Sequence, residues 1–435
     1  MMKLQKEPLW KKAKKKILGG NLLLSKRPEM FLPDYWPTYF KKAKGIDVWS
    51  LKNKKYIDMI FAVGQSSLGY AYKEIDLAVK KAVQNGNMCT LNSSEEVRLA
   101  ENLLELHPWA GMTKFARSGG EANAIAIRIA RAASKKDHVA ICGYHGWHDW
   151  YLSINLKSKN NLKDHLLPGL EPLGVPKALR NTVHTFKNNN IIDLINICKK
   201  FDIGVVKIEI ARNELPNINF LKKIRSFCSK KKIILIFDEC TSGFRNNLGG
   251  IHLTTGVNPD IAMFGKALGN GYAITAVIGK TKVMKAAEGS FISSTFWTEN
   301  IGFVAANKTI EVMKKKKTYK IIQKNGEYIN KKWIELSKKF ALDIKIKGIG
   351  SITSFEFKNN NQLYKTFVTQ EMLKYGYLAS NLIYLSILHN KKVIDRYAYF
   401  LEKVFKKIKH HSIAKKKYKI LKGSVAHSTF KRLTD

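Results

Sequence analysis

Short apolar runs alternate with longer amphipathic stretches through the middle of the chain. Between about residues 113 and 280 the runs have the length of buried strands, and the stretches repeat apolar residues at the helical period. The predicted strands span residues 138–142, 204–210, 233–237, 260–264 and 274–279, and the predicted helices lie near residues 120–134, 188–200 and 219–231. This βαβ rhythm predicts an α/β fold with a mostly parallel sheet that helices cover on both faces.

The two ends of the chain follow other patterns. Before the alternating region we expect a basic helix, a hairpin turning at Asn53-Lys54 and two amphipathic helices, at residues 8–18, 45–63, 73–84 and 94–106. After it we expect a helix, a strand pair and a last helix, at residues 301–317, 344–357 and 391–409. A chain of 435 residues exceeds what one hydrophobic core usually spans. We therefore predict an N-terminal segment, a large domain and a small α+β domain with a tail, over residues 1–60, 61–312 and 313–435.

Charge is the unusual feature of the composition. The 76 Lys and Arg residues outnumber the 34 Asp and Glu residues, which gives a formal net charge of +42. Such an excess leaves a basic nucleic-acid-binding protein open as a remote alternative. Only 11 of the cations are arginines, however, and the lysines are scattered without an RNP-like, zinc-finger or helix-turn-helix pattern. We therefore expect most of this charge on solvated faces and no specific nucleic-acid partner.

The five cysteines indicate a reducing compartment. Their number is odd and they include no C-x-x-C pair, which argues against a disulfide framework. The sequence has no run of about 18 apolar residues that could span a membrane. Its lysine-rich start lacks the apolar core of a secretory signal. We expect a cytoplasmic protein without a membrane partner.

Four polar sites follow predicted strands, at the edge where open α/β sheets bind their ligands. The first is the segment Ser118-Gly119-Gly120-Glu121, which opens the helix at residues 120–134. Ser118 and Glu121 have the spacing of a capping box, so the segment is compatible with a well-capped helix start. The two glycines also leave backbone N–H groups bare at the positive end of the helix dipole, which suits a phosphate.

Asp238 and Lys266 follow two further strands. Asp238, with Glu239 after it, ends an apolar run, and a carboxylate there needs a cation or a strong donor. It could pair with a lysine or Arg245, cap a helix, bind a metal or hold a protonated ring nitrogen. Lys266, in the segment FGKALGNG, is by default a surface lysine. In a dry site at the strand end its pKa would fall and its amine would become a nucleophile.

The fourth site is the segment YHGWHD at residues 144–149. Tyr144 and His145 could cap the core or stack on a planar cofactor ring. His145 and His148 have an H-x-x-H spacing, but no further ligand cluster accompanies it, so we predict no metal. An anion cradle, an acid for a ring nitrogen, an amine and an aromatic plate together are what a pyridoxal phosphate (PLP) enzyme needs.

Nine segments, in order along most of the chain, carry the pattern of a known family. They are GGN (19–21), NKKYIDM (53–59), LGY (68–70), EEVRLAENL (95–103), RSGGEANAIAIRIARA (117–132), YHGWHD (144–149), IFDECTSGFR (236–245), FGKALGNGYAITAVIG (264–279) and STFWTENIG (294–302). With these segments the sequence resembles class III aminotransferases of PLP fold type I, and among them glutamate-1-semialdehyde 2,1-aminomutase. DExxxGFR followed by FGKxLGxG is the most specific part of the likeness.

The resemblance implies both a fold and a reaction. The fold would be an α/β fold-type-I PLP transferase with a large, mostly parallel-sheet domain and a smaller α+β domain. Lys266 would form a Schiff base with pyridoxal 5'-phosphate, and Asp238 would keep the ring nitrogen protonated. The enzyme would move an amino group from an amino donor to an aldehyde or ketone acceptor.

The resemblance also implies further cofactor contacts. Those to the phosphate and the ring would come from Ser118, Gly119, Gly120, Tyr144 and His145. Thr295 resembles a threonine that reaches the phosphate from the neighbouring subunit, which implies a homodimer with shared active sites. Because STFWTENIG is one residue longer than the aminomutase pattern, Thr298 is the alternative.

The chain departs from the aminomutase pattern where that family holds its substrate. The segment NLLLSKRP retains a cation only as Lys26 or Arg27. The strand end KIEIARNELP carries Glu209 and Arg212, and Arg212 could clamp a substrate or pair with Glu209. These departures favour an intermolecular aminotransferase, with the 2,1-aminomutase as the alternative.

Overall fold

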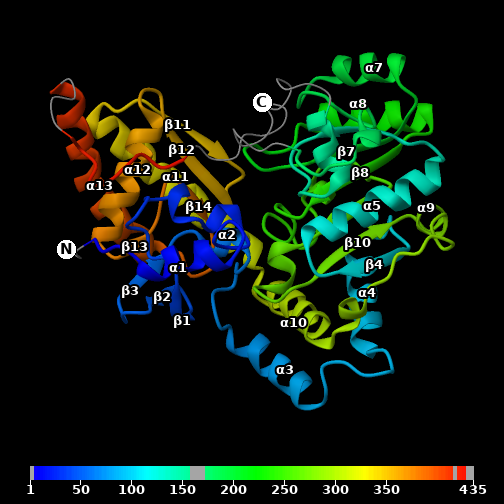
Figure 1. The fold of residues 1–435 in the computed structure, drawn as a ribbon, viewed down its shortest axis with the longest axis horizontal. Helices are drawn as coiled ribbons and strands as arrows, with labels where there is room; N and C mark the ends of the chain where they lie inside the picture. The colour runs from blue at the N-terminus through cyan, green and yellow to red at the C-terminus, as the bar shows by residue number, and fades with distance from the viewer. Residues whose placement is uncertain (1–3, 157–171, 415–418, 428–435) are drawn as a thin grey trace. The chain divides into compact units, whose positions relative to one another are not determined.

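The computed structural model describes residues 4–156, 172–414 and 419–427. The chain divides into two compact units (Figure 1). Among the described residues, the first unit joins residues 4–73 to residues 318–414 and 419–427, and the second holds residues 74–156 and 172–317. Each unit contains a hydrophobic core of its own.

A seven-stranded sheet organises the second unit, in the order β4-β10-β9-β8-β7-β5-β6. Its strands are β4 (Met112–Ala116), β5 (His138–Cys142), β6 (Val183–Thr185), β7 (Ile203–Glu209), β8 (Ile234–Glu239), β9 (Ile261–Phe264) and β10 (Thr275–Gly279). The strands from β9 to β6 are parallel, whereas β10 is antiparallel to both β9 and β4. The mostly parallel α/β sheet predicted from the sequence is confirmed.

Helices pack on this sheet through apolar faces. The helices of the second unit are α3 (Lys73–Gln84), α4 (Ser94–Leu106), α5 (Gly119–Ser134), α6 (Asp149–Leu152), α7 (Ile191–Lys200), α8 (Ile218–Lys231), α9 (Thr281–Lys285) and α10 (Asn300–Lys316). Ile125 and Ile129 of α5 share a core cluster with Val139, Val205 and Ile236 of the strands. Because β4 runs in the same direction as β9, the helix that follows β4 begins at the carboxyl edge of the sheet.

The first unit combines sheets and helices in an α+β arrangement. Its four-stranded sheet has the order β1 (Phe40–Lys44), β2 (Asp47–Ser50), β3 (Lys55–Asp58), β13 (Tyr377–Leu378), and its three-stranded sheet the order β11 (Ile344–Gly348), β12 (Ile352–Phe357), β14 (Leu382–Tyr384). Its helices are α1 (Pro8–Lys16), α2 (Phe61–Gly64), α11 (Thr318–Phe340), α12 (Asn361–Lys374) and α13 (Lys391–Ile413). The predicted hairpin is present as β2 and β3, and Asn53 in its turn has a positive φ of 56°.

Two strands carry no apolar signal in the sequence. β1 reads FKKAK and is almost entirely exposed, and its pairing with β2 rests on backbone hydrogen bonds at the edge of its sheet. β4 reads MTKFA and occupies the edge of the large sheet, where only Ala116 is fully buried. Edge strands pack on fewer neighbours and therefore need less apolar sequence.

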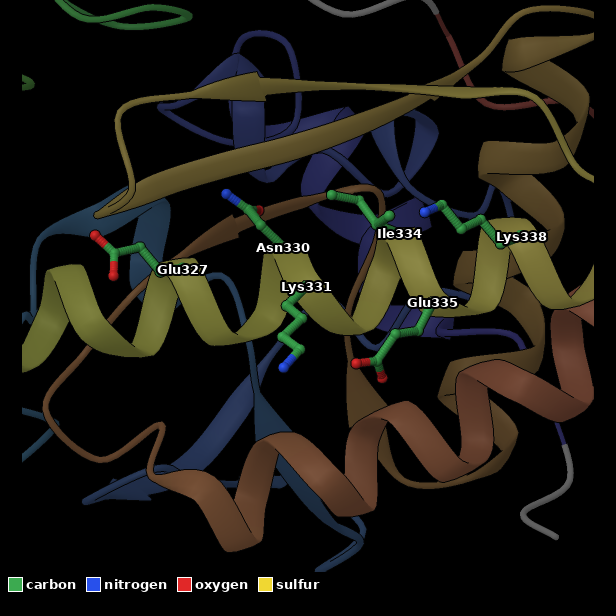
Figure 2. A pocket seen from close by; sticks show the side chains of 6 residues that line it. All are labelled: Glu327, Asn330, Lys331, Ile334, Glu335 and Lys338. Atoms are coloured by element: carbon green, nitrogen blue, oxygen red, sulfur yellow. The ribbon is translucent and has the colours of Figure 1, made fainter.

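A shallow groove of about 470 Å³ runs along α11 in the first unit (Figure 2). Its lining consists of Glu327, Asn330, Lys331, Ile334, Glu335 and Lys338. In Figure 2 Asn330 and Ile334 point to one side of the helix, and Lys331 and Glu335 to the other. Charges of both signs alternate along the groove, without an aromatic plate or a glycine cradle for a cofactor.

None of the helices in the described part of the chain combines the length and the hydropathy that crossing a bilayer would need.

Candidate active site

Four strands of the large sheet end side by side and present polar residues at one edge. In the parallel register Glu209 of β7 lies opposite Asp238 of β8, and Glu239 of β8 lies opposite Phe264 of β9. Lys266 follows β9 by two residues, and Tyr144 follows β5 by the same number. The polar sites predicted from the sequence therefore gather at the carboxyl edge, as expected for an open α/β sheet.

The start of α5 combines a capping box with bare backbone donors. Ser118 Oγ accepts a hydrogen bond from the Glu121 N–H at 3.3 Å, and Glu121 Oε2 accepts one from the Ser118 N–H at 2.7 Å. Both sequence-based interpretations therefore still apply, because capping uses the N–H groups of Ser118 and Glu121 and spares those of the glycines. Among the described residues, no acceptor takes a hydrogen bond from the N–H of Gly119 or Gly120.

Gly120 is required by its surroundings. A Cβ at this position would lie 3.0 Å from both His148 Cδ2 and Trp147 Nε1. A Cβ at Gly119 would lie 3.7 Å from the Sγ of Cys240, which directly follows β8. The glycines thus let the first turn of α5 approach the ends of its neighbours, and a small anion can reach their N–H groups.

Asp238 is buried and held from two sides. Its Oδ2 accepts a hydrogen bond from His145 Nδ1 at 2.9 Å, and its Oδ1 accepts one from the Cys240 N–H at 3.1 Å. Lys207 Nζ lies 3.7 Å from Oδ2. Burial alone would raise the pKa of Asp238, but the Lys207 charge and the His145 hydrogen bond outweigh it and hold the pKa well below its usual value. Asp238 is therefore an anion.

His145 contacts Asp238 edge-on through its ring nitrogen. The ring is almost fully buried, and burial lowers its pKa, so the imidazole is neutral and carries its proton on Nδ1. This contact orients the carboxylate.

Lys207, like Thr241, is a site residue that the sequence alone did not reveal. It lies within β7 and is fully buried, and burial lowers its pKa against the attraction of Asp238. Nζ also contacts Met263 Sδ at 2.9 Å. The signal was a single lysine inside the otherwise apolar run GVVKIEI, because a lysine in a central strand is almost never buried without a partner.

Lys266 opens a tight turn directly after β9. Its φ of 33° lies in the left-handed region, which a side chain adopts only at a cost in free energy. Its Nζ donates to Thr241 Oγ1 at 2.6 Å. Burial, with the nearby Arg212 charge, lowers the pKa of Lys266 to about 8. This is the direction expected from the sequence for a lysine in a dry site at a strand end.

Arg212 and Glu209 form the ion pair that the sequence suggested. Arg212 Nε lies 2.7 Å from Glu209 Oε1, and Arg212 Nη2 donates to Thr241 Oγ1 at 3.2 Å. The guanidinium also lies over the Tyr144 ring, 5.8 Å from its centroid. Since Thr241 also accepts from Lys266, the pair adjoins the reactive amine.

A second buried network anchors the end of β8 from the other face of the sheet. Glu239 accepts hydrogen bonds from the Ile251 N–H at 2.6 Å and from His252 Nδ1 at 2.5 Å. His252 Nε2 in turn accepts from Trp109 Nε1 at 2.9 Å. The sequence alone does not reveal this role of Glu239, because its partners Ile251 and His252 lie 12 and 13 positions further along the chain.

The remaining predicted site residues are not among the partners of Asp238 and Lys266 named above. Thr295 and Thr298 begin and end the exposed 3₁₀ turn η7, where Thr298 Oγ1 donates to the Thr295 carbonyl at 2.8 Å. Arg27 belongs to the first unit, where it precedes the 3₁₀ turn η2 (Pro28–Met30). Arg245, a predicted partner of Asp238, donates to the Thr241 carbonyl.

The side chains at this edge fit a phosphorylated pyridine aldehyde. They supply a half-buried amine of lowered pKa, an oriented carboxylate and a glycine cradle that leaves N–H groups available. A metal fits less well, because the described residues hold no group of three or more His, Cys, Asp or Glu side chains that could bind one.

Comparisons with known proteins identify the family. The sequence pattern of the Aminotransferase class-III family matches residues 33–384, and the chain belongs to this family. It is 32% identical over 367 residues to the 3-aminobutyryl-CoA aminotransferase of Cloacimonas acidaminovorans, covering 82% of this chain and 84% of that protein. It is 28% identical to the glutamate-1-semialdehyde 2,1-aminomutase of Thermodesulfovibrio yellowstonii, covering 86% and 92%. The protein is thus an enzyme, a class III transaminase or aminomutase.

Solved structures agree on the fold. The FumI protein of Sphingopyxis sp. MTA144, in its PLP internal aldimine form, superimposes with a TM-score of 0.85 at 23% identity, covering 94% of this chain and 98% of that chain. A transaminase with PLP bound superimposes with a TM-score of 0.81 at 21% identity, covering 93% and 97%. The fold is that of the fold-type-I PLP transferases.

Proposed function

We propose that this protein is a PLP-dependent aminotransferase that uses Lys266 to move an amino group from an amino donor to an aldehyde or ketone. The observation that carries the proposal is the half-buried Lys266 side chain, whose amine has its pKa lowered to about 8, at the same sheet edge as the oriented Asp238 carboxylate. At neutral pH a part of such an amine is uncharged and able to attack a carbonyl carbon.

Each residue at the strand ends would bind a different part of the cofactor. PLP, when bound, supplies an electron sink for the electron pair released at the substrate carbon. The N–H groups of Gly119 and Gly120 would bind the phosphate, with the Ser118 cap keeping the turn in place. Asp238, oriented by His145, would accept a hydrogen bond from the ring nitrogen. Tyr144 would cover one ring face.

Lys266 would carry the proton during the reaction. An amine of pKa about 8 can both take up and return a proton near neutral pH, as a general base and acid must. Thr241 Oγ1, which accepts from Lys266 Nζ and from Arg212, would receive the amine when it leaves the carbonyl carbon. The left-handed φ of Lys266 fixes where its side chain leaves the backbone.

The substrate is a small molecule held by cations. Arg212 is a candidate for binding a carboxylate, and Glu209 competes for it. The resemblance to the aminomutases gives Arg27 as a further candidate. The likeness to a 3-aminobutyryl-CoA aminotransferase and to a 2'-deamino-2'-hydroxyneamine transaminase from Streptomyces kanamyceticus supports transfer between two molecules. Several relatives are glutamate-1-semialdehyde 2,1-aminomutases, so intramolecular transfer is the second candidate.

The working form would be a cytoplasmic homodimer with shared active sites. Thr295 would reach the phosphate of the neighbouring subunit. The exposure of η7 supports this role, and the Thr298 hydroxyl already donates within the turn, so Thr295 is the better placed of the two.

Absorption spectra during addition of candidate amino acids would test the proposal. The PLP-loaded protein should be yellow, and a true donor should bleach the band until a carbonyl acceptor restores it. Lys266→Ala should lower turnover by more than about 1,000-fold, because it removes the group that transfers the proton. Lys285→Ala, at an exposed position on α9, is the matched control and should retain activity. A protein that converts glutamate 1-semialdehyde without any external donor would instead be the aminomutase.

A further inference from the structure

Lys207 lies where the sheet would ordinarily hold an aliphatic residue. Every residue of β7 is buried, and the register places Lys207 beside Ile141 of β5 and Ile236 of β8. Side chains in register on parallel strands point to the same face. Both isoleucines belong to the core cluster that includes α5, so Lys207 lies in an apolar row beneath that helix. An ammonium group there costs free energy unless a counter-charge meets it.

The counter-charge of Lys207 is Asp238. Nζ lies 3.7 Å from Asp238 Oδ2. A second buried carboxylate at this edge, Glu209, is bound by Arg212 at 2.7 Å. Asp238 and Glu209 are therefore each paired with a cation of the chain itself, before any ligand binds.

A protonated ring nitrogen would therefore be an additional cation at Asp238. Oδ2 already faces Lys207 Nζ and the Nδ1–H of His145. The titratable and charged groups that face Asp238 and Lys207 from the surrounding strand ends are Tyr144, His145, Glu209, Arg212, Cys240 and Lys266. Lys207 is the ammonium group that forms an ion pair with this carboxylate, so its removal frees the Asp238 charge for a ligand.

We propose that Lys207 is a positioning residue that competes with the cofactor's ring nitrogen for the Asp238 carboxylate, so that the nitrogen gives up its proton more readily than it would beside an unpaired aspartate. The inference rests on the proposed function, since it concerns the same PLP site. Lys207 has two effects at this site, and both lower the proton affinity of the ring nitrogen. Its charge makes the carboxylate a weaker proton partner, and it repels a second cation.

Two variants separate the charge of Lys207 from a purely structural role. Lys207→Met keeps the length of the side chain and removes the charge. Lys207→Gln also removes the charge but keeps an N–H donor for Asp238. The matched control is Lys365→Met in α12, because Lys365 is also buried, has its pKa lowered to about 8, and has no hydrogen-bond partner for Nζ among the described residues.

The measurement is the pH at which the ring nitrogen loses its proton, followed by NMR of protein loaded with PLP that is ¹⁵N-labelled in the ring. Both Lys207 variants should shift this titration upward by about one pH unit or more, a tenfold gain in proton affinity. Lys365→Met should titrate as the unchanged protein does. An unshifted titration in both Lys207 variants would overturn the proposal. A shift in Lys207→Met alone would also overturn it, because the N–H donor of Lys207, and not its charge, would then account for its effect on Asp238.

Apoprotein unfolding gives a readout that needs no cofactor. Lys207→Met and Asp238→Asn should each lower the urea midpoint of unfolding, because each single change leaves the other buried group without its partner. The midpoint of the double variant should therefore fall by less than the sum of the two single decreases. Strictly additive losses would contradict the pairing. If the unchanged protein takes up no PLP, the proposed function fails and takes this inference with it. If PLP binds and only the titration is unmoved, the function stands and the role of Lys207 is wrong.

Discussion

At the scale of single residues, the site depends on placing ionisable groups where water cannot solvate them. Lys266 is one of many lysines, yet burial at a strand end lowers its pKa from 10.5 to about 8. Asp238 is more deeply buried, yet it is kept anionic, because Lys207 and His145 outweigh the cost of burial. Removal from water thus gives a reactive amine at one strand end. At the next strand end, a nearby positive charge and a hydrogen bond outweigh that removal and give a stable carboxylate.

This pKa predicts how the uptake of PLP depends on pH. The attacking form is the uncharged amine, so the rate constant for uptake by apoprotein should rise with pH and level off above about 8. An ordinary lysine would keep gaining rate toward its pKa of 10.5. Stopped-flow absorbance at a series of pH values would measure the profile. A rate that still climbs steeply well above pH 8 would show that the reacting amine is not a buried one.

At the scale of elements, α5 connects helix capping to anion binding. Its capping box satisfies the N–H groups of Ser118 and Glu121, which fixes the first turn while the glycine N–H groups stay available. α8 is capped more simply, because Asn217 Oδ1 accepts from the Phe220 N–H at 3.0 Å. Both helices therefore have a side-chain N-cap, but only the cap of α5 directly precedes the glycines of the candidate site.

Removing each cap should separate stability from binding. Ser118→Ala and Asn217→Ala should each lower the free energy of unfolding of apoprotein by about 1 kcal/mol, measured in urea. Only Ser118→Ala should also weaken the affinity for PLP, measured by equilibrium dialysis, because a frayed first turn misplaces the glycine N–H groups. Equal PLP affinity in the two variants would argue against phosphate binding at α5.

Much of the second unit could be predicted because strand and helix patterns there are long and regular. The strand at residues 138–142 and the helices at residues 73–84 and 94–106 have the predicted bounds. The edge strands β1 and β4 could not be predicted, since they are held by pairing rather than by apolar burial. The antiparallel direction of β10 is also set by its neighbours and not by its sequence.

Some features of the candidate site could likewise be predicted from the sequence, and others could not. Lys266, Asp238 and the glycines carry sequence signals because each stands at a strand or helix end. The contact of His145 with Asp238 joins residues 93 positions apart, and that of Lys207 with Asp238 depends on strand register. Such pairs become visible only when the order and the register of the strands are known.

At the scale of the whole molecule, the proposal requires two chains. Each site would take Lys266 from one subunit and Thr295 from the other. The protein should therefore sediment at twice 49.5 kDa, and Thr295→Ala should weaken PLP affinity more than Thr298→Ala does.

Mixed dimers test the sharing directly. A dimer of one Lys266→Ala subunit and one Thr295→Ala subunit should contain one intact site, so mixing the two variants should restore tight PLP binding and activity to about half the sites of the unchanged dimer. Turnover and PLP stoichiometry of the purified mixed dimer would report this. Mixed dimers with no tighter site than the Thr295→Ala homodimer would show that the threonine acts elsewhere.

The central claim is that Lys266 is the amine that binds the aldehyde of PLP. Reduction of the PLP-loaded protein with borohydride, followed by peptide mass mapping, would fix the cofactor to the lysine that holds it. We predict a single phosphopyridoxyl label on Lys266, with none on the buried Lys207 and Lys365, whose pKa values are also lowered. A label on another lysine, or one spread over the many exposed lysines, would contradict the account.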